Sequence, residues 1–172
     1  MLSSISLVGF KSIETVRLEL GRITVLVGPN NGGKSSCLQG LQFATSIAQS
    51  MDINGYKRIK KKDSEERKLA STLASHQLVY TPLNDVNSLA RGGELHGRDG
   101  GNPIQLILTG ETSDDSVRIE VKRGKNKNLS INVEGEKFFR VLKDPAKPYS
   151  VMSPGLAGIP ASEEYKSKGV VT

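Results

Sequence analysis

The sequence has no tryptophan and a single cysteine, and its 172 residues include only four tyrosines and four phenylalanines. One cysteine cannot form an internal disulfide, so Cys37 is typical of a reducing environment. So few aromatic side chains offer no evident stacking platform for single-stranded bases. No apolar run approaches the ~20 residues that cross a bilayer, and the first ten residues lack the features of a secretory signal. We therefore expect a cytoplasmic protein that is not inserted in a membrane.

The composition is that of a globular chain, with 36% hydrophobic and 24% charged residues. The formal net charge is +6. This charge permits association with nucleic acid or with acidic surfaces, but it specifies neither, because net charge governs non-specific association.

Periodicity predicts a mixed α/β chain. Alternating or continuous apolar runs predict strands over residues 4–10, 16–20, 23–27, 104–109, 117–122, 129–133 and 137–142. The compact β-branched run at 23–27 is typical of a buried central strand. A helix is expected from Lys34 to about Ser50, and a second from Asp63 to about Ser75, where Asp63 and Glu66 resemble an N-cap pair. The last four runs predict an antiparallel meander.

One motif carries specific chemistry. Residues 28–35 read Gly-Pro-Asn-Asn-Gly-Gly-Lys-Ser, which fits G-x-x-x-x-G-K-[ST] at every fixed position. Glycines in such a loop let successive backbone N–H groups point inward at phosphates, and the following helix adds its positive N-terminal end. A predicted strand before the loop and a predicted helix after it are the context that this motif requires.

The motif predicts a site for a nucleoside triphosphate with Mg²⁺. Lys34 would place its ammonium against the β- and γ-phosphates, and the Ser35 hydroxyl would ligate the metal. The candidate binding residues are Gly28, Pro29, Asn30, Asn31, Gly32, Gly33, Lys34, Ser35 and Ser36.

The loop reads GPNNGGKSS, and a Gly9-Phe10-Lys11-Ser12 turn precedes it between two predicted strands. Together these features resemble the N-terminal lobe of the SMC, RecF and overcoming-lysogenization-defect (OLD) class of ABC-type ATPases, within the AAA family ATPases. The resemblance covers residues 4–45 and, more loosely, 100–142. It implies ATP as the nucleotide and a P-loop lobe with an antiparallel β-subdomain.

The resemblance also implies roles for other residues. Lys11 and Ser12 match the turn that lies beside the nucleotide in those families, although an ordinary polar turn explains them equally well. Asn31 stands where some members contact the γ-phosphate or the partner subunit, but asparagines here also suit a turn.

Two further motifs of that class are missing from the sequence, namely a strand ending in Asp-Glu (Walker B) and an LSGG-type signature. Residues 89–94 and 106–111 deviate from both in spacing and chemistry. Gln77 and Gln105 have no context that marks a Mg²⁺-sensing glutamine. His76 and His96 lack partners at metal-ligand spacing. We therefore assign no catalytic residue.

These observations predict an ATP-binding lobe over residues 1–142, with the meander at about 104–142. Residues 143–172 are expected to be an irregular tail containing proline and glycine. A single βαβ beginning cannot complete a P-loop sheet, so we expect an incomplete fold whose second lobe is missing.

Three functions remain open. The first is an ATPase acting in DNA maintenance, repair or antiviral (anti-phage) defence, which the resemblance implies would dimerise through the nucleotide site and work with an effector nuclease. The second is a non-catalytic nucleotide-binding interaction module. The third is a P-loop kinase or GTPase, for which no N-K-x-D element is present. Basic residues at 56–68 and 118–127 suit either a DNA backbone or solvent.

Overall fold

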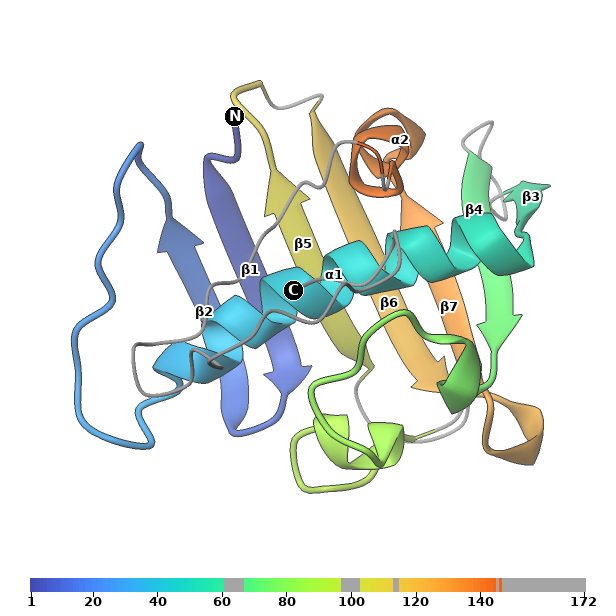
Figure 1. Cartoon of the computed structure of the whole chain (residues 1–172), viewed down its shortest axis with the longest axis horizontal. Helices are drawn as coiled ribbons and strands as arrows, with labels where there is room; N and C mark the ends of the chain where they lie inside the picture. The colour runs from blue at the N-terminus through green and yellow to red at the C-terminus, as the bar shows by residue number, and fades with distance from the viewer. Residues whose placement is uncertain (61–66, 97–102, 113–114, 145, 147–172) are drawn as a thin grey trace, which may run out of the picture.

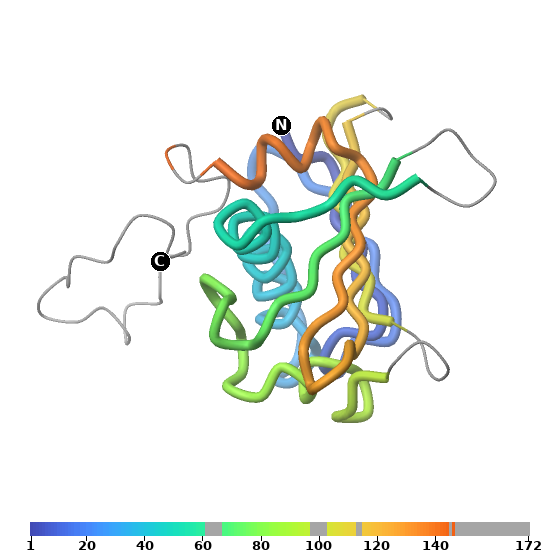
Figure 2. Tube along the Cα trace, turned by 90° about the vertical axis from the view of Figure 1, so that its right-hand side faces the viewer, coloured from blue at the N-terminus to red at the C-terminus, as the bar shows by residue number. Residues whose placement is uncertain are grey.

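The computed structural model describes residues 1–60, 67–96, 103–112, 115–144 and 146. Within them the chain forms one seven-stranded sheet covered on one face by helices (Figures 1 and 2). The strands are β1 (Ser4–Phe10), β2 (Ile13–Glu19), β3 (Lys57–Lys60), β4 (Arg67–Leu73), β5 (Ile104–Thr109), β6 (Ser116–Arg123) and β7 (Leu129–Glu134). The α-helices are α1 (Lys34–Asn54) and α2 (Glu136–Leu142), and the short 3₁₀ helices are η1 (Ser75–Gln77), η2 (Val86–Leu89) and η3 (Lys125–Lys127).

Every strand pairs antiparallel with its neighbours, in the order β2-β1-β5-β6-β7-β4-β3. The β1–β2 hairpin joins the meander β5-β6-β7 through β1, and the β3–β4 hairpin joins its other side through β4. The mixed α/β class is therefore confirmed, and the first three strands of the predicted meander lie within a residue of their expected bounds.

The core lies between the sheet and α1, which runs diagonally across the strands (Figure 1). Alternation along each strand places one set of side chains in this core and leaves the other set on the open face. The buried set includes Ile5, Leu7, Leu106, Ile119 and Ile131. Helix α1 approaches closely at Gly40, where an added Cβ would lie 2.7 Å from Cδ1 of Leu7.

The chain directly after β4, over residues 74–81, packs along one side of α1, as Figure 2 shows. The Ser46 hydroxyl donates to the carbonyl of Tyr80 at 2.7 Å, and the Ser50 hydroxyl accepts from the backbone N–H of Val79 at 2.9 Å. Polar residues in the middle of a helix are thus satisfied by a neighbouring loop, which holds that loop against α1.

Three predicted elements are different in the structure. The helix expected from Asp63 to Ser75 is wrong over its described part, because residues 67–73 form β4 and bury Leu69 and Leu73 on alternate positions against β7. Asp63 and Glu66 lie outside the described residues. The strand expected at 137–142 is helix α2, whose Phe138, Phe139 and Leu142 meet the core with helical spacing.

The third difference concerns the predicted central strand at 23–27. These residues belong to no strand and run along the outlying connection between β2 and α1 (Figure 1). Ile23, Val25 and Val27 are 88%, 76% and 90% exposed. The run fits a buried strand by composition, but the described part of the sheet offers it no neighbour to pair with. The P-loop lobe is therefore not established by this fold.

No helix in the described ranges is both long enough and apolar enough to cross a membrane.

Candidate functional site

The predicted phosphate loop curls back on itself before α1. The backbone N–H of Gly32 donates to the carbonyl of Pro29 at 3.1 Å. Asn31 and Gly33 both take left-handed conformations, with φ of 64° and 84°. Asparagine and glycine tolerate this region best, which explains why these residue types stand here. The loop thus reverses the chain and delivers it to the first helical residue, Lys34.

Helix α1 begins without a side-chain cap. Gly33 occupies the N-cap position and has no side chain to offer, and the first turn contains no acidic residue. The first backbone N–H groups of a helix have no intrahelical partners, and they carry the positive end of the helix dipole. The start of α1 is therefore suited to an anion.

The Lys34 side chain folds over the loop that precedes it. Its ammonium donates to the carbonyl oxygens of Gly28 at 2.8 Å and Pro29 at 2.7 Å. Both contacts are exposed to solvent. An incoming phosphate could replace these neutral acceptors with charged ones, and such charge-assisted bonds are about twice as strong.

A cavity of about 490 Å³ opens at this loop. Its size lies within the ~300–1,000 Å³ of typical small-molecule sites. The described residues that line it are Ser12, Asn30, Asn31, Gly32, Gly33, Lys34, Ser35 and Ser36. The structure therefore brings Ser12 together with most of the predicted loop. Gly28 and Pro29 do not line the cavity, but their carbonyl groups accept hydrogen bonds from Lys34.

The residues present fit a magnesium–triphosphate group in part. The Ser35 hydroxyl is an oxygen donor of the kind that Mg²⁺ prefers, and Lys34 with the uncapped helix start supplies positive charge. Among the described residues that line the cavity there is no carboxylate. A group that activates water for hydrolysis is thus not assigned in this cavity.

Lys11 lies beside the loop but is held by another residue. It adopts a φ of 54° in the β1–β2 turn, and its ammonium donates to Oε1 of Gln39 at 2.7 Å. It is not among the described residues that line the cavity. Gln39 was not predicted as a partner, because a contact across 28 positions of sequence leaves no local signal.

The two weak matches to missing ATPase motifs lie in different places. Residues 89–91 pair with the β1–β2 turn, where the Lys11 N–H donates to the Leu89 carbonyl at 2.7 Å. Glu111 lies beyond the opposite end of β1, near the Met1 amino group. Seven strand residues at ~3.3 Å each separate it from that turn. In this structure Glu111 does not act at the cavity.

The remaining polar candidates are also outside the cavity. Gln77 bonds to Asn54 and to the backbone of Ala74, and so fixes the end of α1 against η1. Gln105 lies on the open face of β5. His76 and His96 are exposed, and within the described ranges no group of histidine, cysteine and acidic residues could hold a metal ion. Burial raises the pKa of the Cys37 thiol behind the loop.

Residues 1–63 match a family model described as "Protein of unknown function (DUF2813)". The matched part contains β1, β2, the loop and α1, and hence every residue of the cavity. A search of curated proteins finds no match.

Proposed function

We propose that this chain binds Mg-ATP through residues 28–36, as one half of a nucleotide site in an SMC/RecF/OLD-like ATPase. The observation that carries the proposal is the position of Lys34, whose ammonium folds over the loop at the uncapped start of α1 and lines the cavity. Positive charge and backbone N–H donors converge there, and none of the described lining residues is a carboxylate.

In this proposal each residue has a defined role. The loop backbone and the first N–H groups of α1 bind the phosphate oxygens, Lys34 bonds the β- and γ-phosphates, and Ser35 ligates Mg²⁺. Bound Mg²⁺ would neutralise phosphate charge. Ser12 contributes a hydroxyl to the lining of the cavity, while Lys11, held by Gln39, supports the turn that contains Ser12.

The exposed run at 23–27 has a place in the same proposal. An extended segment with three exposed β-branched side chains and no strand partner directly precedes the loop. Pairing this segment in a completed sheet would bury that apolar surface at ~25 cal/mol per Å² and satisfy its backbone groups. We propose that it becomes the strand that supports the loop in a complete P-loop core.

The wider biological role follows from the family resemblance. We propose that the complete ATPase dimerises through the nucleotide site and acts in DNA maintenance, repair or antiviral defence, together with an effector such as a nuclease. The absence of a carboxylate among the described lining residues favours one alternative, a module that binds nucleotide without hydrolysing it.

Calorimetric titration of the chain with Mg-ATP tests the proposal. Wild type should show saturable binding, and Lys34→Ala should abolish it. Lys125→Ala serves as the control, because it removes an exposed lysine from η3, away from the lining residues. GTP should compete poorly. Absence of binding by wild type at millimolar ATP, or equal binding by Lys34→Ala, would contradict the proposal.

A further inference from the structure

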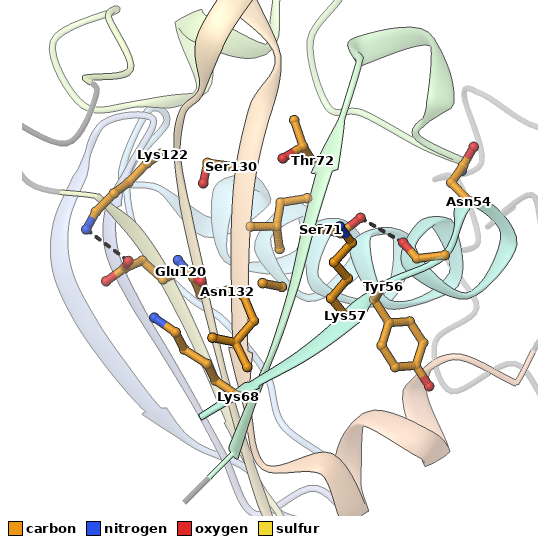
Figure 3. A pocket seen from close by; sticks show the side chains of 14 residues that line it. Asn54, Tyr56, Lys57, Lys68, Ser71, Thr72, Glu120, Lys122, Ser130 and Asn132 are labelled. Carbon is orange, nitrogen blue, oxygen red and sulfur yellow. Dashed lines mark hydrogen bonds and ion pairs between the residues drawn. The ribbon is translucent and has the colours of Figure 1, made fainter. Parts of the chain in front are cut away.

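The open face of the sheet, which α1 does not cover, carries a second concave feature. It lies at the end of the sheet formed by β6, β7, β4 and β3. It is a groove of about 1040 Å³ across β3, β4, β7 and β6 (Figure 3). Its polar lining includes Lys57, Lys68, Thr72, Lys122, Ser130 and Asn132. It shares no described lining residue with the cavity at the loop.

On the part of this face formed by β3, β4 and β6, the described residues include the four cations Lys57, Lys68, Arg118 and Lys122, which we call the basic face. Lys122 is bonded to Glu120 at 2.9 Å, and Figure 3 shows the Lys68 ammonium on the same side of the sheet as this pair. Arg118 precedes Glu120 by two positions on β6 and therefore faces the same way. Within the described part of the chain, Lys57, Lys68 and Arg118 make no ion pair.

The fold brings together two basic segments that are about fifty residues apart in sequence. Lys57 pairs with Ala70, so Lys68 stands diagonally from it at a typical spacing of ~7–8 Å. In the strand register Glu134 of β7 lies between Arg118 of β6 and Lys68 of β4, so a carboxylate stands among these cations. The cations thus lie on β3, β4 and β6, on both sides of β7, an arrangement that the linear sequence does not display.

The groove also presents neutral hydrogen-bonding groups between the cations. Asn132 lies between Glu120 and Ala70 in the cross-strand register, and Ser130 lies between Lys122 and Thr72. Their side chains have no hydrogen-bond partner in the described ranges. Hydroxyl and amide groups beside lysines are typical contacts for phosphate oxygens and sugars.

We infer that the basic face binds the sugar–phosphate backbone of nucleic acid. Three cations without an ion pair among the described residues, neutral donors and an open sheet face suit a polyanion that lies across the strands. A sequence pI of about 9.5 with cations gathered on one face is the expected electrostatic pattern. The described residues of the basic face lie on sheet strands and offer backbone contacts, so we expect the binding to be independent of base sequence.

Fluorescence anisotropy with a labelled duplex DNA, measured without nucleotide over a range of salt concentrations, tests this inference. The double variant Lys68→Gln with Arg118→Gln should weaken binding and reduce the slope of log K against log salt by about 2. The control is Arg22→Gln with Arg91→Gln, which removes the same charge from exposed residues outside the basic face and should leave the slope unchanged.

Three outcomes would overturn the inference. Wild type could fail to bind DNA at low salt, or the control pair could weaken binding as much as the basic-face pair. Polyglutamate could also compete as well as unlabelled DNA, which would make the face a site for an acidic protein. Circular dichroism verifies that both double variants are folded. Because no nucleotide is present, a failure here leaves the proposed ATP binding untouched, and failure of ATP binding leaves this test intact.

Discussion

The Nζ atom of Lys34 lies 2.8 Å from the carbonyl oxygen of Gly28, so the predicted phosphate loop is closed by its own lysine. This hydrogen bond is exposed to solvent, so the ammonium exchanges a bond to water for a bond to the carbonyl oxygen and buries no apolar surface. A net hydrogen bond of this kind contributes only ~0.5–1.5 kcal/mol. The lysine is therefore available to a ligand at little cost to the fold.

The first prediction separates binding from stability at this position. Lys34→Ala should lower the free energy of unfolding by less than ~1.5 kcal/mol, while it removes ATP binding. Leu106→Ala, in the buried core, should lower it by ~2–5 kcal/mol. Urea denaturation measures both. A loss for Lys34→Ala as large as that for Leu106→Ala would mean that the loop is part of the structural core.

The second prediction concerns the close contact between Gly40 and Leu7. Gly40→Ala would improve helix propensity by ~1 kcal/mol, yet its new methyl would meet the Leu7 side chain at 2.7 and 2.8 Å. Leu7 is fully buried, so it cannot move aside freely. We expect net destabilisation, since overpacking costs ~1–3 kcal/mol.

A double-mutant cycle gives this prediction its control. Leu7→Ala alone should destabilise the chain by leaving a cavity, and the added methyl of Gly40→Ala should fill part of it. The combined variant should therefore be more stable than the sum of the single changes implies. Simple additivity would show that α1 does not approach β1 at Gly40.

Local patterns predicted the elements whose identity is decided by neighbours in sequence. The β5-β6-β7 strands alternate strictly, and the glycine-rich loop leads directly into α1. Residues 67–73 contain leucines at positions 69 and 73, a spacing that suits one helical face or one strand face. Pairing with β7 decided for the strand. Residues 137–142 contain adjacent phenylalanines, and only packing showed that both are buried in a helical turn.

In the candidate site, too, some features follow from local sequence and others only from the tertiary structure. The motif alone predicted the loop, the start of the helix and the roles of Lys34 and Ser35. The family resemblance pointed to Ser12, and the structure places it on the cavity wall. The Lys11–Gln39 contact and the gathering of the basic face depend on strand order and helix placement, which no local pattern encodes.

The third prediction tests the exposure of the run at 23–27 with one substitution at two positions. Val25→Thr should change the free energy of unfolding of this chain by no more than ~0.5 kcal/mol, because Val25 is 76% exposed. Val121→Thr makes the same change in the core and should cost ~1–3 kcal/mol for a buried hydroxyl without a partner. Equal costs would show that Val25 is buried in solution.

The last prediction concerns pH. Glu136 accepts hydrogen bonds from Arg58 at 2.7 Å and from Arg140 at 2.8 Å, and these lower its carboxyl pKa from 4.5 to about 2. A depressed pKa in the folded state stabilises the fold above the unfolded pKa, and this stabilisation is lost as the pH falls from about 4.5 to about 2. Glu136→Gln should therefore flatten the pH dependence of the unfolding free energy in that window.

Arg58→Gln removes the larger cause of the lowered pKa but leaves Arg140, so it should reduce the pH dependence without abolishing it. Urea denaturation at a series of pH values distinguishes the variants, and identical curves for wild type and Glu136→Gln would show that this pair of arginines does not hold the carboxylate in solution.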